Sequence, residues 1–87
     1  MSEKTKTNES RQVTYNIHQH LGSLGISRNG WTKEINIVSW NEGRPRLDIR
    51  DWSPEHDKMS RGIGLNEEEV LNFLALMQGI NVKDLGI

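Results

Sequence analysis

Apolar and polar side chains alternate along residues 31–41 and 45–52, and this alternation constrains the fold more than any other feature of the sequence. A period of two is typical of β-strands that bury one face. A three-residue loop over 42–44, with Trp40 opposite Arg46, pairs the two segments as an antiparallel hairpin. If the aliphatic side forms the core, the two tryptophans of these segments lie on the other side. The aliphatic face is then predicted to hold Ile35, Ile37, Leu47 and Ile49, and the polar face Thr32, Glu34, Asn36, Val38, Trp40, Arg46, Asp48, Arg50 and Trp52.

Turn and bulge signals predict further strands around this hairpin. Residues 13–26 predict a long first strand, and its alternation shifts across Gly22, which indicates a β-bulge. Arg28, Asn29 and Gly30 predict a turn, because Asn-Gly supplies the positive φ angles of tight hairpins. The segment 53–60 contains Pro54 and mixed charges and suits a loop, whereas 61–65 predicts a short fourth strand.

One helix is predicted after the strands, from Asn66 to about Gln78. Asn66 is a favourable N-cap, and Glu69 completes a capping box three residues later. Gly79 fits the position after the helix end. The predicted fold class is therefore α+β, with a four-stranded antiparallel sheet followed by one C-terminal helix.

This predicted helix is apolar on nearly every side, because Asn72 is the one polar residue between Val70 and Met77. A chain of this size buries only about 60% of its unfolded surface, and it has no cysteine that could form a disulfide. A helix without a polar side needs a second covering surface. A symmetric homodimer supplies one, with an interface predicted to include Val70, Phe73, Leu74 and Met77.

Charge and composition divide the chain into parts. Residues 1–12 have the composition of a disordered polar tail, residues 13–79 are predicted to form the domain, and 80–87 form a short C-terminal tail without an assigned structure. Residues 1–62 carry 10 basic and 8 acidic side chains, net +2, whereas residues 63–87 carry 1 basic and 4 acidic, net −3. A sheet face can therefore be locally positive. Without a signal sequence or an apolar span of about 20 residues, the protein is expected to be cytoplasmic, with no membrane partner.

Two tryptophans and two arginines share the predicted polar face: Trp40, Trp52, Arg46 and Arg50. Bases stack on aromatic rings at about 1–3 kcal/mol each, and arginines neutralise backbone phosphates. The pattern therefore favours sequence-tolerant binding of single-stranded nucleic acid. Two alternatives stay open. Either the tryptophans are core residues of a sheet covered on both faces, or they form a patch that binds another protein, such as a polymerase subunit.

Metal and catalytic sites are not predicted. His18 and His20 would share one face of a strand, but two ligands are too few and no third is obvious. Ser53, His56 and Asp57 match a catalytic triad only as residue types, since three groups so close along a loop rarely reach triad geometry. We therefore expect a protein that is not an enzyme and needs no cofactor.

Several blocks of the sequence resemble one known family. They are residues 30–36 (GWTKEIN), 38–41 (VSWN), 48–50 (DIR), 52–54 (WSP), 58–59 (KM), 62–63 (GI) and 67–69 (EEE), with His56 and Leu65 between them. In this order they closely resemble the YdbC-type bacterial proteins. Those proteins belong with the single-stranded-DNA-binding domain of the eukaryotic transcriptional positive cofactor four. The resemblance covers about residues 13–78.

The resemblance implies a curved four-stranded sheet that dimerises through its helix and holds single-stranded DNA on concave faces. Trp40 and Trp52 match the aromatic positions that stack on bases, and Arg50 matches the arginine of the Asp-Ile-Arg motif. Lys33 and Arg46 lie at basic positions of the family, although Lys33 falls on the predicted aliphatic side and would have to reach round an edge. The implied nucleic-acid-binding set is Trp31, Lys33, Asn36, Trp40, Asn41, Arg46, Arg50 and Trp52.

Two departures from the eukaryotic members limit what is carried over. Those members have a long serine- and lysine-rich regulatory region before the domain, whereas about twelve polar residues precede it here, so a regulated coactivator role is not implied. The sheet is also less rich in lysine, which predicts a shallow salt dependence. RNA stays an alternative ligand. Transcription or replication proteins are candidate partners, and transcription, replication and repair are the candidate processes.

Overall fold

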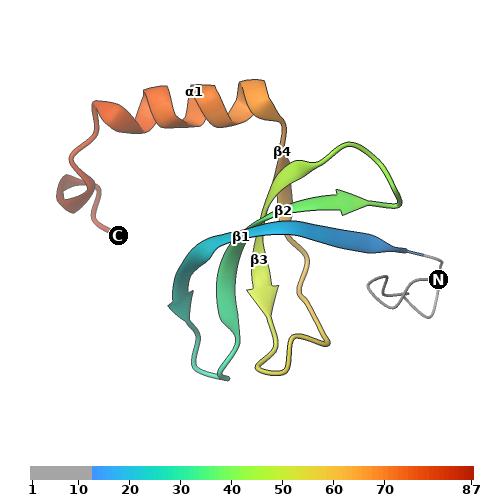
Figure 1. The fold of residues 1–87 in the computed structure, drawn as a ribbon. Helices are drawn as coiled ribbons and strands as arrows, with labels where there is room; N and C mark the ends of the chain where they lie inside the picture. The colour runs from blue at the N-terminus through green and yellow to red at the C-terminus, as the bar shows by residue number, and fades with distance from the viewer. Residues whose placement is uncertain (1–12) are drawn as a thin grey trace.

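The computed structural model describes residues 13–87, which form a four-stranded antiparallel sheet followed by a helix. The strands β1 (Tyr15–Ile26), β2 (Thr32–Trp40), β3 (Arg46–Trp52) and β4 (Ile63–Leu65) lie side by side in chain order (Figure 1). The helix α1 spans Glu67–Gln78, and a short 3-10 helix, η1, spans Val82–Asp84. The predicted α+β class, with four antiparallel strands followed by one helix, is confirmed. The predicted tail, 1–12, lies outside the described residues.

The first strand bends strongly and gives the sheet its curvature (Figure 1). Its register with β2 shifts at three places, and each shift inserts one extra residue into β1. Such bulges increase the bend and twist of a strand. The bulge predicted at Gly22 is confirmed, and two further bulges accompany it. The shifts lie between Ile17 and Gln19, between His20 and Gly22, and between Ser23 and Gly25.

The turn between β1 and β2 closes around Gly30. Ser27 N donates to the Trp31 carbonyl at 2.8 Å, and Gly30 N donates to the Ser27 carbonyl at 3.0 Å. Gly30 has a φ of +88°, whereas Asn29 has no positive φ. The turn is therefore a three-residue hairpin loop with glycine in the left-handed position, and the positive φ predicted for Asn29 is wrong.

The pairing of β2 with β3 differs from the predicted hairpin by two residues. Arg46 pairs with Val38, while Trp40 pairs with Tyr15 of β1. The predicted pair of Trp40 and Arg46 is therefore wrong, and the connecting loop is longer than three residues. A shift of two residues keeps every side chain on its own face. We call the face that carries Tyr15, Trp40 and Arg50 the aromatic face, and the opposite one the aliphatic face.

The most deeply buried residues lie on the aromatic face. Tyr15, Val38 and Trp52 form the core, with exposed fractions of 7%, 0% and 0%. The predicted core was on the other side, where the residues are only half-buried: Ile35, Ile37, Leu47 and Ile49. This part of the prediction is wrong because strand parity separates two faces without indicating which face a later loop covers.

The start of α1 is fixed by the predicted capping box. Asn66 Oδ1 accepts a hydrogen bond from Glu69 N, and Asn66 N donates to Glu69 Oε1, both at 2.8 Å. Glu67 and Glu68 add negative charge in the first turn, where the helix dipole favours it. The helix ends at Gln78, as predicted.

The rest of α1 has little contact with the sheet. It leaves the end of β4 and runs outward beyond the strands (Figure 1), and within residues 13–87 it contacts only β3 and β4 among the named elements. Because α1 contacts so little of the sheet, several of its large apolar side chains lie exposed: Leu71, Phe73, Leu74 and Leu76.

No helix in this part of the chain has the length and apolarity needed to cross a membrane.

Candidate nucleic-acid interface

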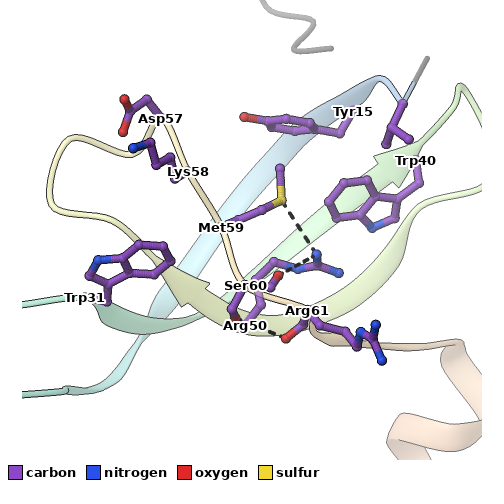
Figure 2. Close-up of a pocket in the computed structure, with 10 residues that line it drawn as sticks. Tyr15, Trp31, Trp40, Arg50, Asp57, Lys58, Met59, Ser60 and Arg61 are labelled. Carbon is purple, nitrogen blue, oxygen red and sulfur yellow. Dashed lines mark hydrogen bonds between the residues drawn. The ribbon is translucent and has the colours of Figure 1, made fainter. Parts of the chain in front are cut away.

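A cleft of about 540 Å³ opens on the aromatic face (Figure 2). Its walls come from the start of β1 and the residues before it, from the residue before β2, the end of β2, the middle of β3 and the segment after β3. It combines three large aromatic side chains with three basic ones. The lining residues are Val13, Tyr15, Trp31, Trp40, Arg50, Asp57, Lys58, Met59, Ser60 and Arg61.

Three aromatic side chains of the cleft offer surface for stacking or support it. The ring centroids of Tyr15 and Trp40 are 5.3 Å apart, with an angle of 44° between the planes. Trp31 and Trp40 are half-buried, so part of each indole stays open. Figure 2 shows these two indoles at opposite ends of the cleft, with Met59 between them in that view. The cleft can therefore present flat apolar surface at two separate points.

Trp52 lies beneath the loop 53–60 and is fully buried. The His56 imidazole stacks on its indole, with 4.0 Å between centroids and 4° between planes. Met59 forms an isolated β-bridge with Trp52. A base cannot reach an indole that is covered in this way. In this structure the loop therefore occupies the place that a base would need at Trp52, and the stacking role of Trp52 stays a prediction.

Hydrogen bonds around Ser53 hold this loop closed. The Ser53 hydroxyl accepts from Asp57 N at 3.2 Å and from Lys58 N at 3.0 Å, and it donates to Asp57 Oδ1 at 2.8 Å. His56 directs its Nε2 to Glu34 Oε1, at 3.0 Å. The serine, histidine and aspartate that match a triad as residue types thus shape the loop that carries Lys58 and Met59 to the cleft.

Arg50 is fixed in the wall of the cleft by its partners. Its Nε and Nη2 donate to the two carboxylate oxygens of Asp48, each at 2.7 Å. Its Nη1 donates to the Ser60 carbonyl at 3.2 Å and to Met59 Sδ at 3.6 Å. The guanidinium also lies 4.4 Å from the Trp40 ring centroid, within range of a cation–π interaction.

Lys58 and Arg61 are the exposed cations of the cleft, and neither forms an ion pair within residues 13–87. Arg46 is also exposed and belongs to the aromatic face. Lys33 lies on the aliphatic side, where its Nζ contacts Asp51 Oδ1 at 3.0 Å. Its side chain therefore lies on the side of the sheet opposite the cleft, and its contact with nucleic acid stays a prediction.

Two predicted contact residues belong to the scaffold. Asn36 is 1% exposed, with its side chain bonded to His20 Nδ1 at 2.7 Å and to Glu34 Oε1 at 3.0 Å. Asn41 joins the ends of β1 and β2, since its Oδ1 accepts from Thr14 N at 3.0 Å and its N donates to Thr14 O at 2.7 Å. Asn36 is therefore closed to a ligand, and Asn41 lies outside the cleft lining.

The two histidines of β1 do not share a face. His18 Nε2 lies 2.7 Å from Ser39 Oγ, and His20 Nδ1 lies 2.7 Å from Asn36 Oδ1. Ser39 and Asn36 belong to opposite faces of β2. The prediction of one shared face is wrong, because a bulge between Ile17 and Gln19 interrupts the alternation.

Glu34 is a titratable group whose pKa is shifted by its surroundings. Its side chain is 13% exposed and has His56 and His20 as neighbours, with oxygen-to-nitrogen distances of 3.0 and 3.7 Å. Burial raises the pKa of Glu34, but hydrogen bonds from Asn36 and His56 and the charge of both histidines outweigh it and leave the pKa below the ordinary value of 4.5.

We expect this depressed pKa to make the fold sensitive to acid. The ionised form stabilises the folded state above pH 4.5, and the contribution is lost as the pH falls through the lower pKa of the folded state. The free energy of unfolding, measured with urea between about pH 3 and 6, should therefore fall less steeply for Glu34→Gln than for the wild type. Glu55→Gln, which changes an exposed loop carboxylate, is the control and should follow the wild type.

Among the lining residues that sequence reasoning missed are Tyr15, Lys58, Met59 and Arg61. Tyr15 had the right alternation within β1, but the bulges hide which face of β2 it joins. The other three come from a connecting segment in which no periodicity applies. The sequence contains one usable signal for them, namely the block KM at 58–59 within the family resemblance.

The fold and the cleft define the class of this protein: a small α+β domain whose sheet face combines aromatic and basic side chains. The family model described as Transcriptional Coactivator p15 (PC4) matches residues 27–76, more than half of the chain. An uncharacterized protein of Treponema pallidum (strain Nichols) is 38% identical over 69 residues, which cover 78% of this chain and 80% of that protein. The chain belongs to the PC4 family, and the predicted family resemblance is confirmed. The domain of this family is known for binding single-stranded DNA and for coactivator roles, and the family is not enzymatic.

Proposed function

We propose that this protein binds single-stranded DNA with little sequence preference, as a homodimer, through the cleft on the aromatic face. The observation that carries the proposal is the composition of that cleft: two partly open indoles, Trp31 and Trp40, beside the exposed cations Lys58 and Arg61. Every base has a flat face that can stack on an indole, so such a site tolerates different sequences. Membership in the PC4 family supports the same ligand.

The cleft favours a single strand over a duplex for a physical reason. In a duplex the bases are stacked on each other, and an indole gains access only after the stack is opened. In a single strand, stacking on each indole contributes about 1–3 kcal/mol. The cations neutralise phosphates, and each neutralised phosphate of a single strand contributes about 0.7 to the slope of log K against log salt.

The direct test is a titration of fluorescently labelled oligo-dT, followed by anisotropy, beside a duplex of the same length. We expect the single strand to bind much more tightly than the duplex, and a single-stranded RNA of matched sequence tests the alternative ligand. Equal binding of both DNA forms, or no binding, would contradict the proposal. In that case the alternative hypothesis, that the aromatic face binds another protein, becomes the better explanation.

The phosphate contacts can be tested separately. We expect Lys58→Ala/Arg61→Ala to lower the salt slope by about 1.4, which corresponds to two phosphate contacts of a single strand. Lys33→Ala is the matched control, because Lys33 lies on the other side of the sheet, and it should leave the slope unchanged. If Lys33→Ala lowers the slope and the double variant does not, the DNA strand binds the aliphatic face, and the proposed position of the site is wrong.

The homodimer is proposed to form through α1. The helix leaves Phe73 and Leu74 exposed to 50% and 57%, and on a helix they share a stripe with Val70 and Met77, whereas Asn72 lies on the opposite side. We expect sedimentation equilibrium to give twice the chain mass of 10.0 kDa. Leu74→Asp should shift the mass to that of one chain, whereas Asn72→Asp introduces the same charge and should leave the dimer intact. A wild type that sediments as one chain would rule out this part of the proposal.

A further inference from the structure

We infer that Arg50 is a positioning residue of the binding site and not a ligand of phosphate. Together with Asp48 it forms a neutral pair that fixes the indole of Trp40 and the backbone of residues 59–62. This inference rests on the proposed function, since it assigns a role within that cleft. It also departs from the role that the family motif predicted for Arg50.

The charge of Arg50 is already compensated inside the protein. Asp48 is fully buried, and its two oxygens each accept a hydrogen bond of 2.7 Å from the guanidinium. A buried carboxylate is stable only while it is paired. If Arg50 left Asp48 to contact a phosphate, the buried carboxylate of Asp48 would lose its partner and the fold would be destabilised. The pair therefore adds little net positive charge to the cleft.

The remaining donors of Arg50 are also engaged. A guanidinium has five N–H groups, and four of them have partners here: Nε one, Nη2 one and Nη1 two. The Arg50 side chain is 14% exposed. One donor and a narrow exposed edge are a poor site for bidentate recognition of a phosphate.

Arg50 instead determines where its neighbours lie. Its guanidinium is 4.4 Å from the centroid of Trp40, and Figure 2 shows Tyr15 above this indole and Arg50 below it in that view. The segment after the loop lies directly against Arg50, because a Cβ added at Gly62 would come within 2.5 Å of Arg50 Cβ and of the Ile49 carbonyl. That segment carries Arg61 into the cleft.

Two variants separate positioning from phosphate binding. Arg50→Lys keeps the positive charge opposite Asp48 but loses the planar, bidentate geometry. Asp48→Asn/Arg50→Gln removes both charges and leaves no unpaired carboxylate. Each is titrated with labelled oligo-dT from about 50 to 400 mM salt, with Arg61→Ala as the reference for a lost phosphate contact. Melting followed by circular dichroism verifies that both variants are folded.

We expect both variants to bind about tenfold more weakly, the order of one impaired stacking contact, with the salt slope of the wild type. Arg61→Ala should instead lower the slope by about 0.7. Wild-type affinity in Arg50→Lys, or a salt slope lowered by about 0.7 in Asp48→Asn/Arg50→Gln, would overturn the inference and make Arg50 a phosphate ligand.

A second readout does not depend on DNA. In a Trp31→Phe background, acrylamide quenching of fluorescence reports Trp40, because Trp52 is fully buried. We expect quenching to increase in both Arg50 variants and to stay unchanged in Arg61→Ala. If oligo-dT fails to bind the wild type but quenching still changes as expected, the proposed function fails while the positioning of Trp40 by Arg50 stands. Unchanged quenching overturns the positioning role.

Discussion

Replacing Trp31 and Trp40 together with alanine is expected to weaken the binding of single-stranded oligo-dT by roughly 100-fold, because each indole provides a stacking contact of about 1–3 kcal/mol. Both side chains line the cleft and stay partly open. The loss should appear in anisotropy titrations at fixed salt. Weak binding to duplex DNA should change little, since a duplex cannot use the indoles.

The control for this result is Trp31→Phe/Trp40→Phe, which keeps an aromatic ring at both positions. We expect it to recover most of the affinity, while both double variants keep the oligomeric state of the wild type. Wild-type affinity in the alanine variant would show that bases do not stack on these rings. Equal losses in the alanine and phenylalanine variants would indicate a packing defect instead of lost stacking.

Trp52→Ala is expected to lower the free energy of unfolding by about 3–5 kcal/mol, the usual cost of deleting a buried tryptophan. Trp52 is fully buried, with its ring centroid 5.7 Å from that of Tyr15 and 4.0 Å from that of His56. Domains of this size are stable by only about 5–15 kcal/mol, so the variant should be largely unfolded at moderate urea concentrations. Urea denaturation measures the change.

Trp31→Ala is the matched control for Trp52→Ala, because Trp31 is half-buried at the edge of the cleft. Trp31→Ala should lower the free energy of unfolding much less than Trp52→Ala does, and it should weaken DNA binding while the protein stays folded. A folded Trp52→Ala protein with nearly wild-type stability and no DNA binding would restore the stacking role that the sequence predicted for Trp52. This comparison therefore tests the largest difference between the sequence-based site and the structural one.

The alternation of β2 and β3 predicted the two sheet faces correctly because it depends only on the geometry of a strand. Their register could not be predicted in the same way, since it depends on how residues 41–45 turn. A shift of two residues moved the partner of Arg46 from Trp40 to Val38, yet it left the faces intact. The capping box of Asn66 and Glu69 is another local signal, and the helix begins where it indicates.

The candidate site was harder to predict because a loop outside the strands completes it. The loop 53–60 covers Trp52 and brings Lys58 and Met59 to the cleft, and no periodic pattern encodes that closure. Trp31, Trp40 and Arg50 of the predicted set do line the cleft. Lys33 does not line the cleft, because it lies on the aliphatic side of the sheet and pairs there with Asp51. The strand parity had indicated this side.

The bulges of β1 also bear on solubility. This strand is the outermost one on its side of the sheet, and a flat outer strand presents unpaired N–H and C=O groups to which strands of other molecules can add. Three register shifts along β1 break the even spacing of those groups and twist the strand. The free margin of the sheet is thus a poor template for fibril growth, even though neighbouring apolar side chains such as Leu24 and Ile26 are exposed.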